Sequence, residues 1–168
     1  MTEEWRPVVG YEGLYEVSDA GRVRSVDRYV ERTGRPVRLR GVLMKLQRAQ
    51  AGGYWTVAMC QGGLQRTHTV HSLVMQAFVG PRPDGMEVRH LDGDPTNSRL
   101  SNLAYGVPSE NALDRVRHGT HNMTRKTHCK HGHEFTEANT YLMRSGGRDC
   151  RTCHNSRARA KRRELRAS

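Results

Sequence analysis

The chain has 168 residues, of which 35% are hydrophobic and 6% aromatic, so small modules are expected rather than one large core. Lysine and arginine total 28 against 17 acidic residues, and this formal charge of +11 favours DNA or RNA as a partner over an acidic membrane surface. No run of about 18 apolar residues occurs, which argues against a membrane span. The start MTEEWRPVVG lacks the basic-then-apolar order of a signal peptide, so we expect a cytoplasmic protein.

Residues 1–64 have the pattern of short strands separated by turns. In RVRSV, the alternation of basic and apolar residues places Val23 and Val26 toward a core and Arg22 and Arg24 outside. Nine basic residues stand against two acidic ones between positions 22 and 48. We predict a basic, β-rich DNA-binding module in which Arg22 and Arg24 contact the phosphates, with a merely solvated basic face as the alternative. Cys60 is expected to be a small buried strand residue.

Residues 65–120 predict a helix, a hairpin and a second helix. The expected elements are a helix at 71–78, strands at 86–91 and 99–105 around a turn at 92–96, and a helix from about Glu110, capped by Ser109 and stopped by Gly119. On the last helix, Ala112, Leu113 and Val116 share one face. Asn111, Arg115 and His118 share the opposite face, where Arg115 and His118 are expected to contact phosphates.

One histidine and two asparagines lie at defined positions in this strand–turn–strand–helix order. Asn102 lies 12 residues after His90, at the return strand, and Asn111 lies 21 residues after it, near the start of the helix. This arrangement resembles the H-N-H nuclease family, especially its phage and intron-encoded homing endonucleases. The matching residues are His90, Asp92, Gly93, Asn97, Asn102, Leu103, Glu110 and Asn111. The stretches HSLVMQAF and EEWRPVVGYEGLYEVSDAGRVRSV also resemble segments that precede such cores, so the likeness spans residues 3–118.

The resemblance implies a ββα-metal core that hydrolyses phosphodiester bonds in double-stranded DNA and leaves 5′-phosphate and 3′-hydroxyl ends. It makes His90 the general base, a role that suits a neutral imidazole. It makes Asn102 the residue that fixes the hairpin by bonding its backbone. Asn111, with Asp92 as a further candidate, becomes a ligand of a divalent cation, Mg or Mn.

One position departs from the family pattern. The residue before the catalytic histidine is often an aspartate that shares the metal, whereas here it is Arg89. Arginine cannot ligate a cation but can hold a phosphate through two hydrogen bonds, so Arg89 is assigned to DNA binding. The metal would then rest on Asn111, DNA oxygens and water, with Asp92 or another acid. His71 is either a second active-site or phosphate-binding group or, equally well, a capping or core residue.

Residues 121–168 contain two close pairs of potential metal ligands. Cys129 and His133 are separated by three residues and Cys150 and Cys153 by two, with sixteen residues between the pairs. Four such ligands suit a structural zinc site, whose binding would supply the folding energy of so small a unit. His131, His128 and His154 compete with His133 for the fourth position. The basic stretch HNSRARAKRREL predicts a helix in which Arg157, Arg159 and Arg162 contact DNA, or else a solvated tail.

These observations predict an α+β protein with three modules: a β-rich module at 1–64, a ββα-metal nuclease core at 65–120, and a treble-clef-like zinc module with a basic helix at 121–168. The expected activity is that of a metal-dependent homing-type DNA endonuclease, phage-encoded and acting as a monomer. Two other classes stay open: a zinc-containing DNA-binding protein with an inactive core, which Arg89 favours, and an RNA-binding zinc protein.

Overall fold

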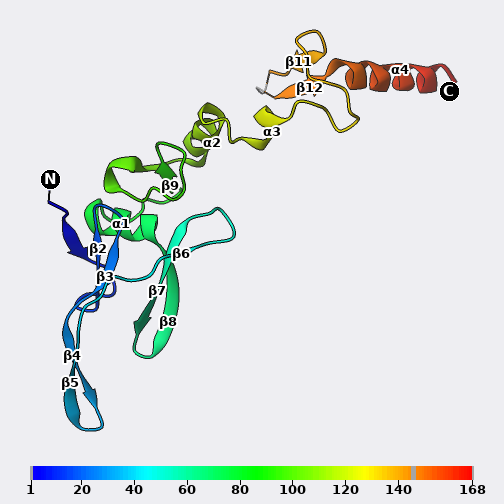
Figure 1. Cartoon of the computed structure of the whole chain (residues 1–168). Coiled ribbons are helices and arrows are strands. Elements are labelled where there is room, and N and C mark those ends of the chain that lie inside the picture. Colours follow the sequence, from blue (N-terminus) through cyan, green and yellow to red (C-terminus); the bar gives the residue numbers. More distant parts are fainter. Residues whose placement is uncertain (1, 145–146, 168) are drawn as a thin grey trace. The chain divides into compact units, whose positions relative to one another are not determined.

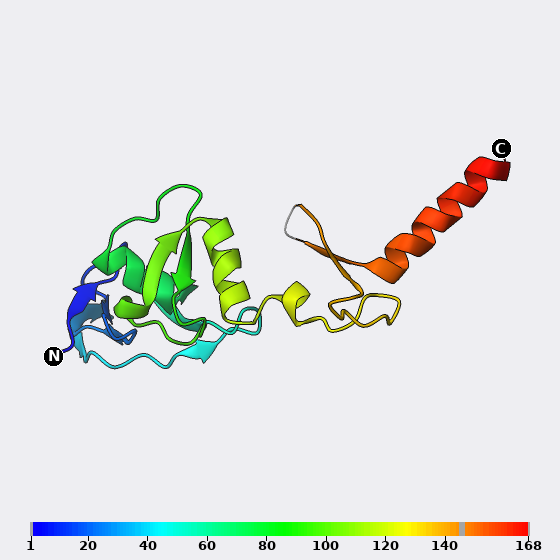
Figure 2. The ribbon, with the colours of Figure 1, turned by 90° about the horizontal axis from the view of Figure 1, so that it is seen from above.

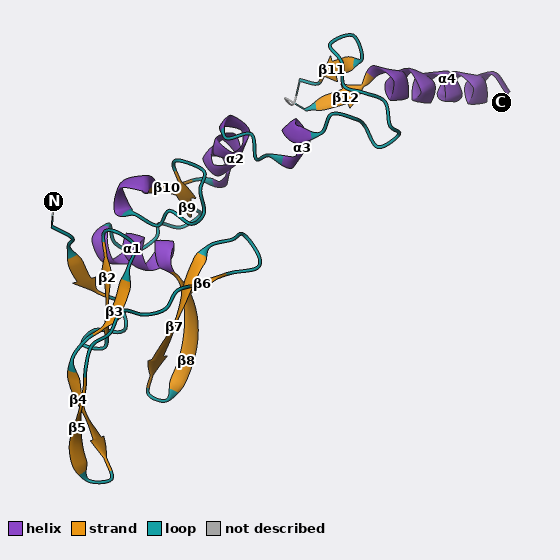
Figure 3. Cartoon of the chain, viewed as in Figure 1, coloured by secondary structure: helices purple, strands orange, loops and turns teal. Residues whose placement is uncertain are grey.

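The computed structural model describes residues 2–144 and 147–167, and the chain divides into two compact units, Met1–His118 and Gly119–Ser168 (Figure 1). Both units mix strands and helices, which confirms the expected α+β class (Figure 3). The first unit contains β1 (Trp5–Pro7), β2 (Tyr15–Ser18), β3 (Val23–Ser25), β4 (Arg28–Arg32), β5 (Arg35–Leu39), β6 (Gln47–Arg48), β7 (Trp55–Gln61), β8 (Leu64–Thr69), α1 (Val70–Phe78), β9 (Glu87–His90), the 3₁₀ turn η1 (Leu100–Asn102), β10 (Leu103–Gly106) and α2 (Pro108–Arg117). The second contains α3 (Asn122–Arg125), β11 (Thr140–Leu142), β12 (Arg148–Cys150) and α4 (Arg151–Ala167).

Helix α1 is the centre of the first unit. Its residues Val70, Leu73 and Val74 recur at the helical repeat and are buried. The helix contacts the antiparallel sheet β1–β2–β3, the sheet β6–β7–β8 and the hairpin β9–β10. The shared core consists of Val8, Tyr11, Tyr15, Val17, Val23, Val57, Met59, Val70, Leu73, Val74, Met75 and Leu103. One hydrophobic cluster therefore joins the predicted N-terminal module to the predicted nuclease core.

Strand alternation corrects two expectations for the N-terminal region. Val23 is buried as expected, but Ser25 rather than Val26 is the second buried residue of this segment, because residues two apart share a face of β3. Cys60 is exposed, so its assignment as a buried residue was wrong. In β7 the buried face carries Val57 and Met59, and Cys60 comes next along the strand, on the other face.

The hairpin β9–β10 forms where the sequence predicts it. Its antiparallel register pairs Glu87 with Gly106 at one end and His90 with Leu103 at the other. The return segment is a 3₁₀ turn followed by a strand rather than one long strand, and the backbone N–H of Leu91 donates to the carbonyl of Asn102 across it at 2.9 Å. His90 is thus the last paired residue before the turn.

Helix α2 differs from the expectation at its start and in its buried face. It begins at Pro108, a residue suited to the first turn, so Ser109 is not the cap. Glu110 instead accepts a hydrogen bond from the backbone N–H of Val107 at 3.0 Å. Leu113 is 57% exposed, whereas Asp114 is buried. The helix therefore packs on the hairpin through a polar residue and not through the predicted apolar face.

The second unit consists of a loop, the hairpin β11–β12 and the long helix α4 (Figure 2). Cys150, at the end of β12, is the buried hydrophobic residue of this unit among those described. The unit therefore has almost no apolar core of its own. None of the helices in the described part of the chain combines the length and the apolar character needed to cross a membrane.

Candidate functional site

The turn after His90 is built from side chains that bond the backbone. Asp92 accepts hydrogen bonds from the backbone N–H of Asp94 at 2.8 Å and from the Asn97 side chain at 2.7 Å. Asp94 in turn accepts from the backbone N–H of Thr96 at 2.8 Å. Such local bonds are the reason that Asp and Asn dominate turns. The sequence DGDPTN therefore forms a turn that is held by its own side-chain hydrogen bonds.

Asn102 ties this turn to the return segment. Its side-chain oxygen accepts from the backbone N–H of Asp92 at 3.0 Å. Its amide nitrogen donates to the Asp92 carboxylate and to the carbonyl of Asn97, both at 2.9 Å. Asn102 is buried, and these three bonds use both ends of its amide. They fix the backbone directly after His90, which is the contact expected of this asparagine.

His90 lies in an aromatic pocket formed with Tyr54 and His71. The Tyr54 and His90 rings are stacked, with centroids 5.6 Å apart and planes 27° apart. The His71 ring meets His90 edge-on, at 5.1 Å and 86°. Tyr54 and His71 also contact each other, at 4.8 Å. Both histidines are only 9% exposed, so the three rings form one packed group.

Burial sets the charge state of both imidazoles. It lowers the pKa of His90, although Asp92 and Asp94 oppose this effect by favouring the charged form. Burial, together with the neighbouring His90, lowers the pKa of His71 from 6.5 to about 4. Both rings are therefore neutral at physiological pH. In His90 the Nε2 atom is shielded and has no partner among the described residues, which leaves Nδ1 as the nitrogen open to an incoming molecule.

The opposite face of β9 carries Arg89, whose guanidinium is clamped by helix α2. Its Nε and Nη2 atoms both lie 2.7 Å from Oδ2 of Asp114, and Nη1 lies 3.2 Å from Glu110. The side chains of Arg89 and Asp114 are only 14% and 10% exposed. Arg89 is thus a largely buried structural cation, and its proposed contact with DNA stays a prediction.

The two candidate ligands of a catalytic cation do not lie together. The Asn111 side chain donates to Glu87 at 2.7 Å, and Glu87 is at the opposite end of β9 from His90, about 10 Å along the strand. Asp92 lies beyond His90 and is occupied by the turn. On the Asn111 side of the hairpin, the guanidinium of Arg89 is paired with Asp114 and Glu110. The assignment of Asn111 and Asp92 as ligands of a divalent cation stays a prediction.

The predicted DNA-contacting residues of the first unit have different environments. Arg22 pairs with Glu3, and Arg24 pairs with Glu16 at 2.7 Å while its guanidinium lies over the Trp5 ring. Both bridge elements of the module instead of projecting as unpaired charges. Arg115 and His118 are exposed on α2, as expected.

His118 lies against the turn. A Cβ atom on Gly93 would come within 2.6 Å of the His118 ring, and the φ of Gly93 is +77°. Glycine at this position therefore allows the end of α2 to approach the turn. This brings an exposed imidazole close to the segment that follows His90.

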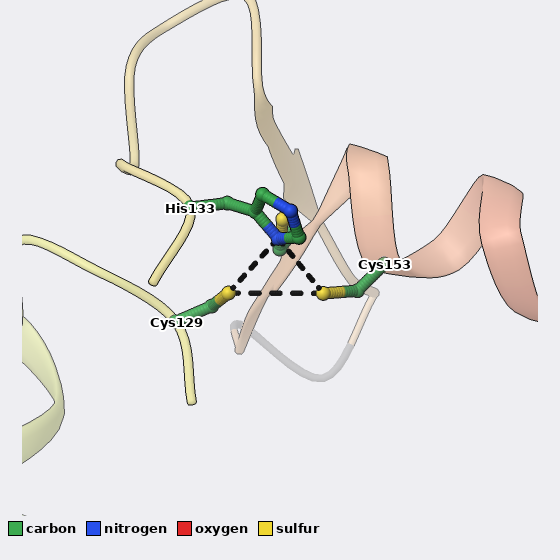
Figure 4. Close-up of side chains that lie close together, drawn as sticks. Cys129, His133 and Cys153 are labelled. Atoms are coloured by element: carbon green, nitrogen blue, oxygen red, sulfur yellow. Dashed lines mark hydrogen bonds between the residues drawn. The ribbon is translucent and has the colours of Figure 1, made fainter. Parts of the chain in front are cut away.

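Four side chains of the second unit converge as the sequence predicts. The ligand atoms of Cys129, His133, Cys150 and Cys153 all lie within 4.8 Å of one another. Nδ1 of His133 is 3.5 Å from Sγ of Cys129 and 3.3 Å from Sγ of Cys153, and the two sulfurs are 3.7 Å apart (Figure 4). A tetrahedral zinc ion with ordinary bond lengths has edges of about 3.8 Å between sulfurs and about 3.5 Å between sulfur and nitrogen. The cluster therefore has the dimensions of a zinc site, with His133 as the histidine that completes it.

Hydrogen bonds around the cluster hold its ligands in place. The backbone N–H of His131 donates to Sγ of Cys129 at 3.4 Å, and the Asn139 amide lies 3.5 Å from Sγ of Cys150. Asn139 also accepts from the backbone N–H of Thr152 at 3.1 Å, which caps the first turn of α4. N–H donors of this kind stabilise thiolates and orient metal ligands.

The basic residues of α4 divide into two kinds. Arg157 pairs with Asp149 at 2.5 Å and donates to the carbonyl of Cys153, so it braces the cluster. Arg159 and Arg162 are exposed.

The sequence patterns did not identify two residues of the site, Tyr54 and Asp114. Tyr54 lies in GGYWTVAMC, a stretch with a plain strand pattern that carries no sign of a contact with His90. Asp114 sits on a helix where acidic residues are ordinarily solvated. An available signal was the unusual Arg89, because a buried arginine requires an acidic partner.

Two family models match the first unit. Residues 3–60 match the NUMOD4 motif, and residues 68–113 match an HNH endonuclease family. The second match contains α1, the hairpin and the start of α2, with His71, His90 and Asn102.

Among similar proteins, DNA endonuclease I-HmuI of Bacillus phage SP01 is 29% identical over 122 residues, which are 73% of this chain and 63% of that protein. An uncharacterised HNH endonuclease, L245 of Acanthamoeba polyphaga mimivirus, is 25% identical over 75% of this chain and 34% of its own length. Protein 3.8 of Escherichia phage T7 is 43% identical over 42 residues, 25% of this chain and 35% of that protein. The chain thus spans less than two thirds of each of these relatives.

A solved structure of I-HmuI, described as showing DNA binding and cleavage by this HNH homing endonuclease, matches with a TM-score of 0.57 and 30% identity. The match covers 73% of this chain and 63% of that one. The first unit therefore carries a match to the NUMOD4 motif followed by a match to an HNH endonuclease family, and it is similar to I-HmuI in sequence and in fold.

Proposed function

We propose that the protein is a homing-type DNA endonuclease that hydrolyses a phosphodiester bond of double-stranded DNA, with His90 as the general base. The observation that carries the proposal is the position of His90 at the end of β9, neutral and followed by a turn that Asn102 fixes. The DNA endonuclease I-HmuI, which aligns over this region, supports the choice of DNA as substrate.

In the proposed reaction, Nδ1 of His90 accepts a proton from a water molecule as the water oxygen attacks phosphorus. The bond from phosphorus to the 3′ oxygen breaks, and this oxygen leaves with a proton from solvent, which gives 5′-phosphate and 3′-hydroxyl ends. An imidazole that is neutral at the working pH suits this step, because only the neutral ring can accept the proton. Asn102 acts by holding the backbone that carries the ring.

A divalent cation, Mg or Mn, is part of this proposal, although the chain does not supply its ligands in the expected way. Such an ion would provide positive charge beside the leaving oxygen. Because Asn111 and Asp92 are not neighbours, we propose that DNA oxygens and water provide most of the ligands. Titration of Mg or Mn into the cleavage reaction tests this metal dependence.

The second unit is proposed to be a structural zinc module that contributes to DNA binding through α4. The net charge of +11 favours a DNA backbone as partner, and the exposed Arg159 and Arg162 are the candidate contacts. Arg115 and His118 are candidates in the first unit. For a phage-encoded enzyme the site of action would be the cytoplasm of the host cell.

A catalytically inactive DNA-binding protein is the second candidate, and one observation favours it. The Arg89–Asp114 ion pair occupies the face of the hairpin on which a metal-binding acid is expected. Such a protein would keep the fold and the charge but not cleave.

Incubation of supercoiled plasmid with the full-length protein and with Mg or Mn, beside a His90→Ala variant, separates the two candidates. We expect the parent to nick the plasmid and the variant to bind it equally well without nicking. Equal binding by both with no nicking under either metal would favour the inactive protein. A preference for single-stranded RNA in competition would contradict both.

A further inference from the structure

The three aromatic rings around His90 come from three separate segments of the chain. Tyr54 comes from the loop between β6 and β7, His71 from the first turn of α1, and His90 from the end of β9. The loop lies within the residues that match the NUMOD4 motif, whereas the two histidines lie within the HNH match. A residue of the accessory motif thus packs directly on the proposed general base.

His90 has no hydrogen bond that would orient its ring. No described residue bonds either ring nitrogen, and Nε2 is shielded from solvent without a partner. A general base is ordinarily held by a third group that bonds its second nitrogen. Here the ring is held by packing. It stacks on the Tyr54 ring and meets the His71 ring at nearly a right angle. The ring orientation that catalysis needs therefore depends on these two neighbours.

The loop that carries Tyr54 is shaped to place this ring. Gly52 and Gly53 are consecutive residues with φ of +76° and +68°, a conformation that other residues rarely adopt. A Cβ atom on Gly52 would lie 2.4 Å from the Tyr54 ring. A Cβ atom on Gly53 would lie 3.7 Å from Pro95, a residue of the turn that follows His90. The positive φ angles let the chain bend at this pair, and the missing side chain of Gly52 leaves room for the Tyr54 ring.

We propose that Tyr54 and His71 are positioning residues, which orient the His90 imidazole by ring packing in place of a hydrogen bond. The inference rests on the proposed function, since it assigns His90 a reaction. His71 packs as an uncharged ring, so it does not repel a proton on His90. The His90 ring is oriented by the shape and aromatic character of its two neighbours. The hydroxyl of Tyr54 and the nitrogens of His71 are not required.

The test compares leucine and phenylalanine variants at both positions in the full-length protein. Tyr54→Leu and His71→Leu remove the flat ring, whereas Tyr54→Phe and His71→Phe keep it. In single-turnover cleavage at saturating protein, we expect the leucine variants to lose about 10- to 100-fold in rate, the range for a slightly misplaced catalytic group. The DNA dissociation constant should stay unchanged, and the phenylalanine variants should recover most of the rate.

A spectroscopic measurement keeps the proposal testable without cleavage. The ring protons of His90, identified as the signals lost in His90→Ala, should show ring-current shifts in the NMR spectrum of the parent. These shifts should move toward ordinary values in Tyr54→Leu and stay in Tyr54→Phe. Thermal unfolding of every variant identifies any that fail to fold.

The outcomes separate the two proposals. Unchanged rates in both leucine variants, or losses that phenylalanine does not recover, would overturn the positioning role while the nuclease function stands. A parent that never cleaves would overturn the function, and the NMR shifts would then decide whether the rings pack as described. Unshifted His90 signals in the parent would overturn the packing itself.

Discussion

At the scale of single residues, two buried polar groups of the first unit have opposite arrangements. His71 is enclosed by neighbouring rings, and its Nδ1 has no hydrogen-bond partner among the described residues. Arg89 is equally enclosed but is fully engaged by acidic side chains of α2. The folded protein is therefore more stable when His71 is neutral, whereas Arg89 is stabilised in its charged form by its acidic partners.

Stability should fall in mild acid because of His71. Its pKa is about 4 in the folded protein and 6.5 in an unfolded chain, so between these values the unfolded state binds more protons and unfolding is favoured. The contribution of His71 is therefore fully present above pH 6.5 and is lost as the pH falls toward 4. We expect a loss of about 3 kcal/mol over this range. Urea unfolding at pH 7 and pH 4.5 measures it, and in His71→Phe the difference should shrink.

The ion pair between Arg89 and Asp114 yields a prediction on stability. Asp114→Ala leaves a buried guanidinium without its main partner, which should lower the free energy of unfolding by about 3 kcal/mol. The double variant Arg89→Met with Asp114→Leu removes both charges and should recover most of this loss. Chemical denaturation of the three proteins gives the comparison. A loss in the double variant as large as in Asp114→Ala would show that packing, and not charge, holds this face.

At the scale of elements, the hairpin β9–β10 is held more by its turn than by its four paired residues on each strand. The Asn102 side chain bonds the backbone N–H and the carboxylate of Asp92 and the backbone carbonyl of Asn97. Asn102→Ala should therefore reduce cleavage at least about 10-fold, because the backbone after His90 loses its fixed position. It should leave DNA affinity nearly unchanged. The matched control is Asn97→Ala, which removes one bond to Asp92 and a long bond from the backbone N–H of Arg99 and should have the smaller effect.

Helix α2 provides a second prediction at this scale. Leu113 lies on the face that periodicity assigns to the core but is exposed, so Leu113→Gln should change stability by less than about 0.5 kcal/mol. Thermal unfolding beside Asp114→Ala tests the point. A large loss of stability in Leu113→Gln would mean that the apolar face of α2 is buried.

The sequence predicted those elements whose signals are local. The repeat of apolar residues in HSLVMQAF predicted α1, and the turn residues after His90 predicted the hairpin. The bond from Asn102 to the hairpin backbone was implied by the family resemblance. The pairs around Cys129 and Cys150 predicted the ligand cluster, because their spacing has few other uses. The contacts that it could not predict join distant segments. Nothing near Tyr54 indicates His90, and nothing in the periodicity of α2 indicates that Asp114 would be buried by Arg89.

At the scale of the whole molecule, the two units have different sources of stability. The first has a shared hydrophobic core around α1, whereas the second has one buried cysteine and a set of four ligands. Below about 40 residues of ordered structure, a metal or a disulfide usually replaces a core. The four cysteines of the chain are unpaired, so a metal held by the four ligands is the stabilising group that we propose for the second unit.

Removal of zinc should therefore unfold the second unit and spare the first. We expect a strong chelator to abolish the NMR signals of folded β11, β12 and α4 while the core around α1 stays intact. One equivalent of zinc should restore the lost signals. Cys153→Ser should reproduce the loss, and Cys60→Ser, a change at an exposed cysteine far from the cluster in sequence, should not. Persistence of the second unit without metal would contradict the assignment.

The glycine-rich bend before Tyr54 has a consequence for how such proteins diversify. Accessory motifs are commonly regarded as interchangeable parts that can be grafted onto a reactive core without altering it. In this chain an exchange of the leading motif would also remove Tyr54, the ring that stacks on His90. A chimera that keeps this packing would have to retain Gly52, Gly53 and Tyr54 together with the segment that carries His90.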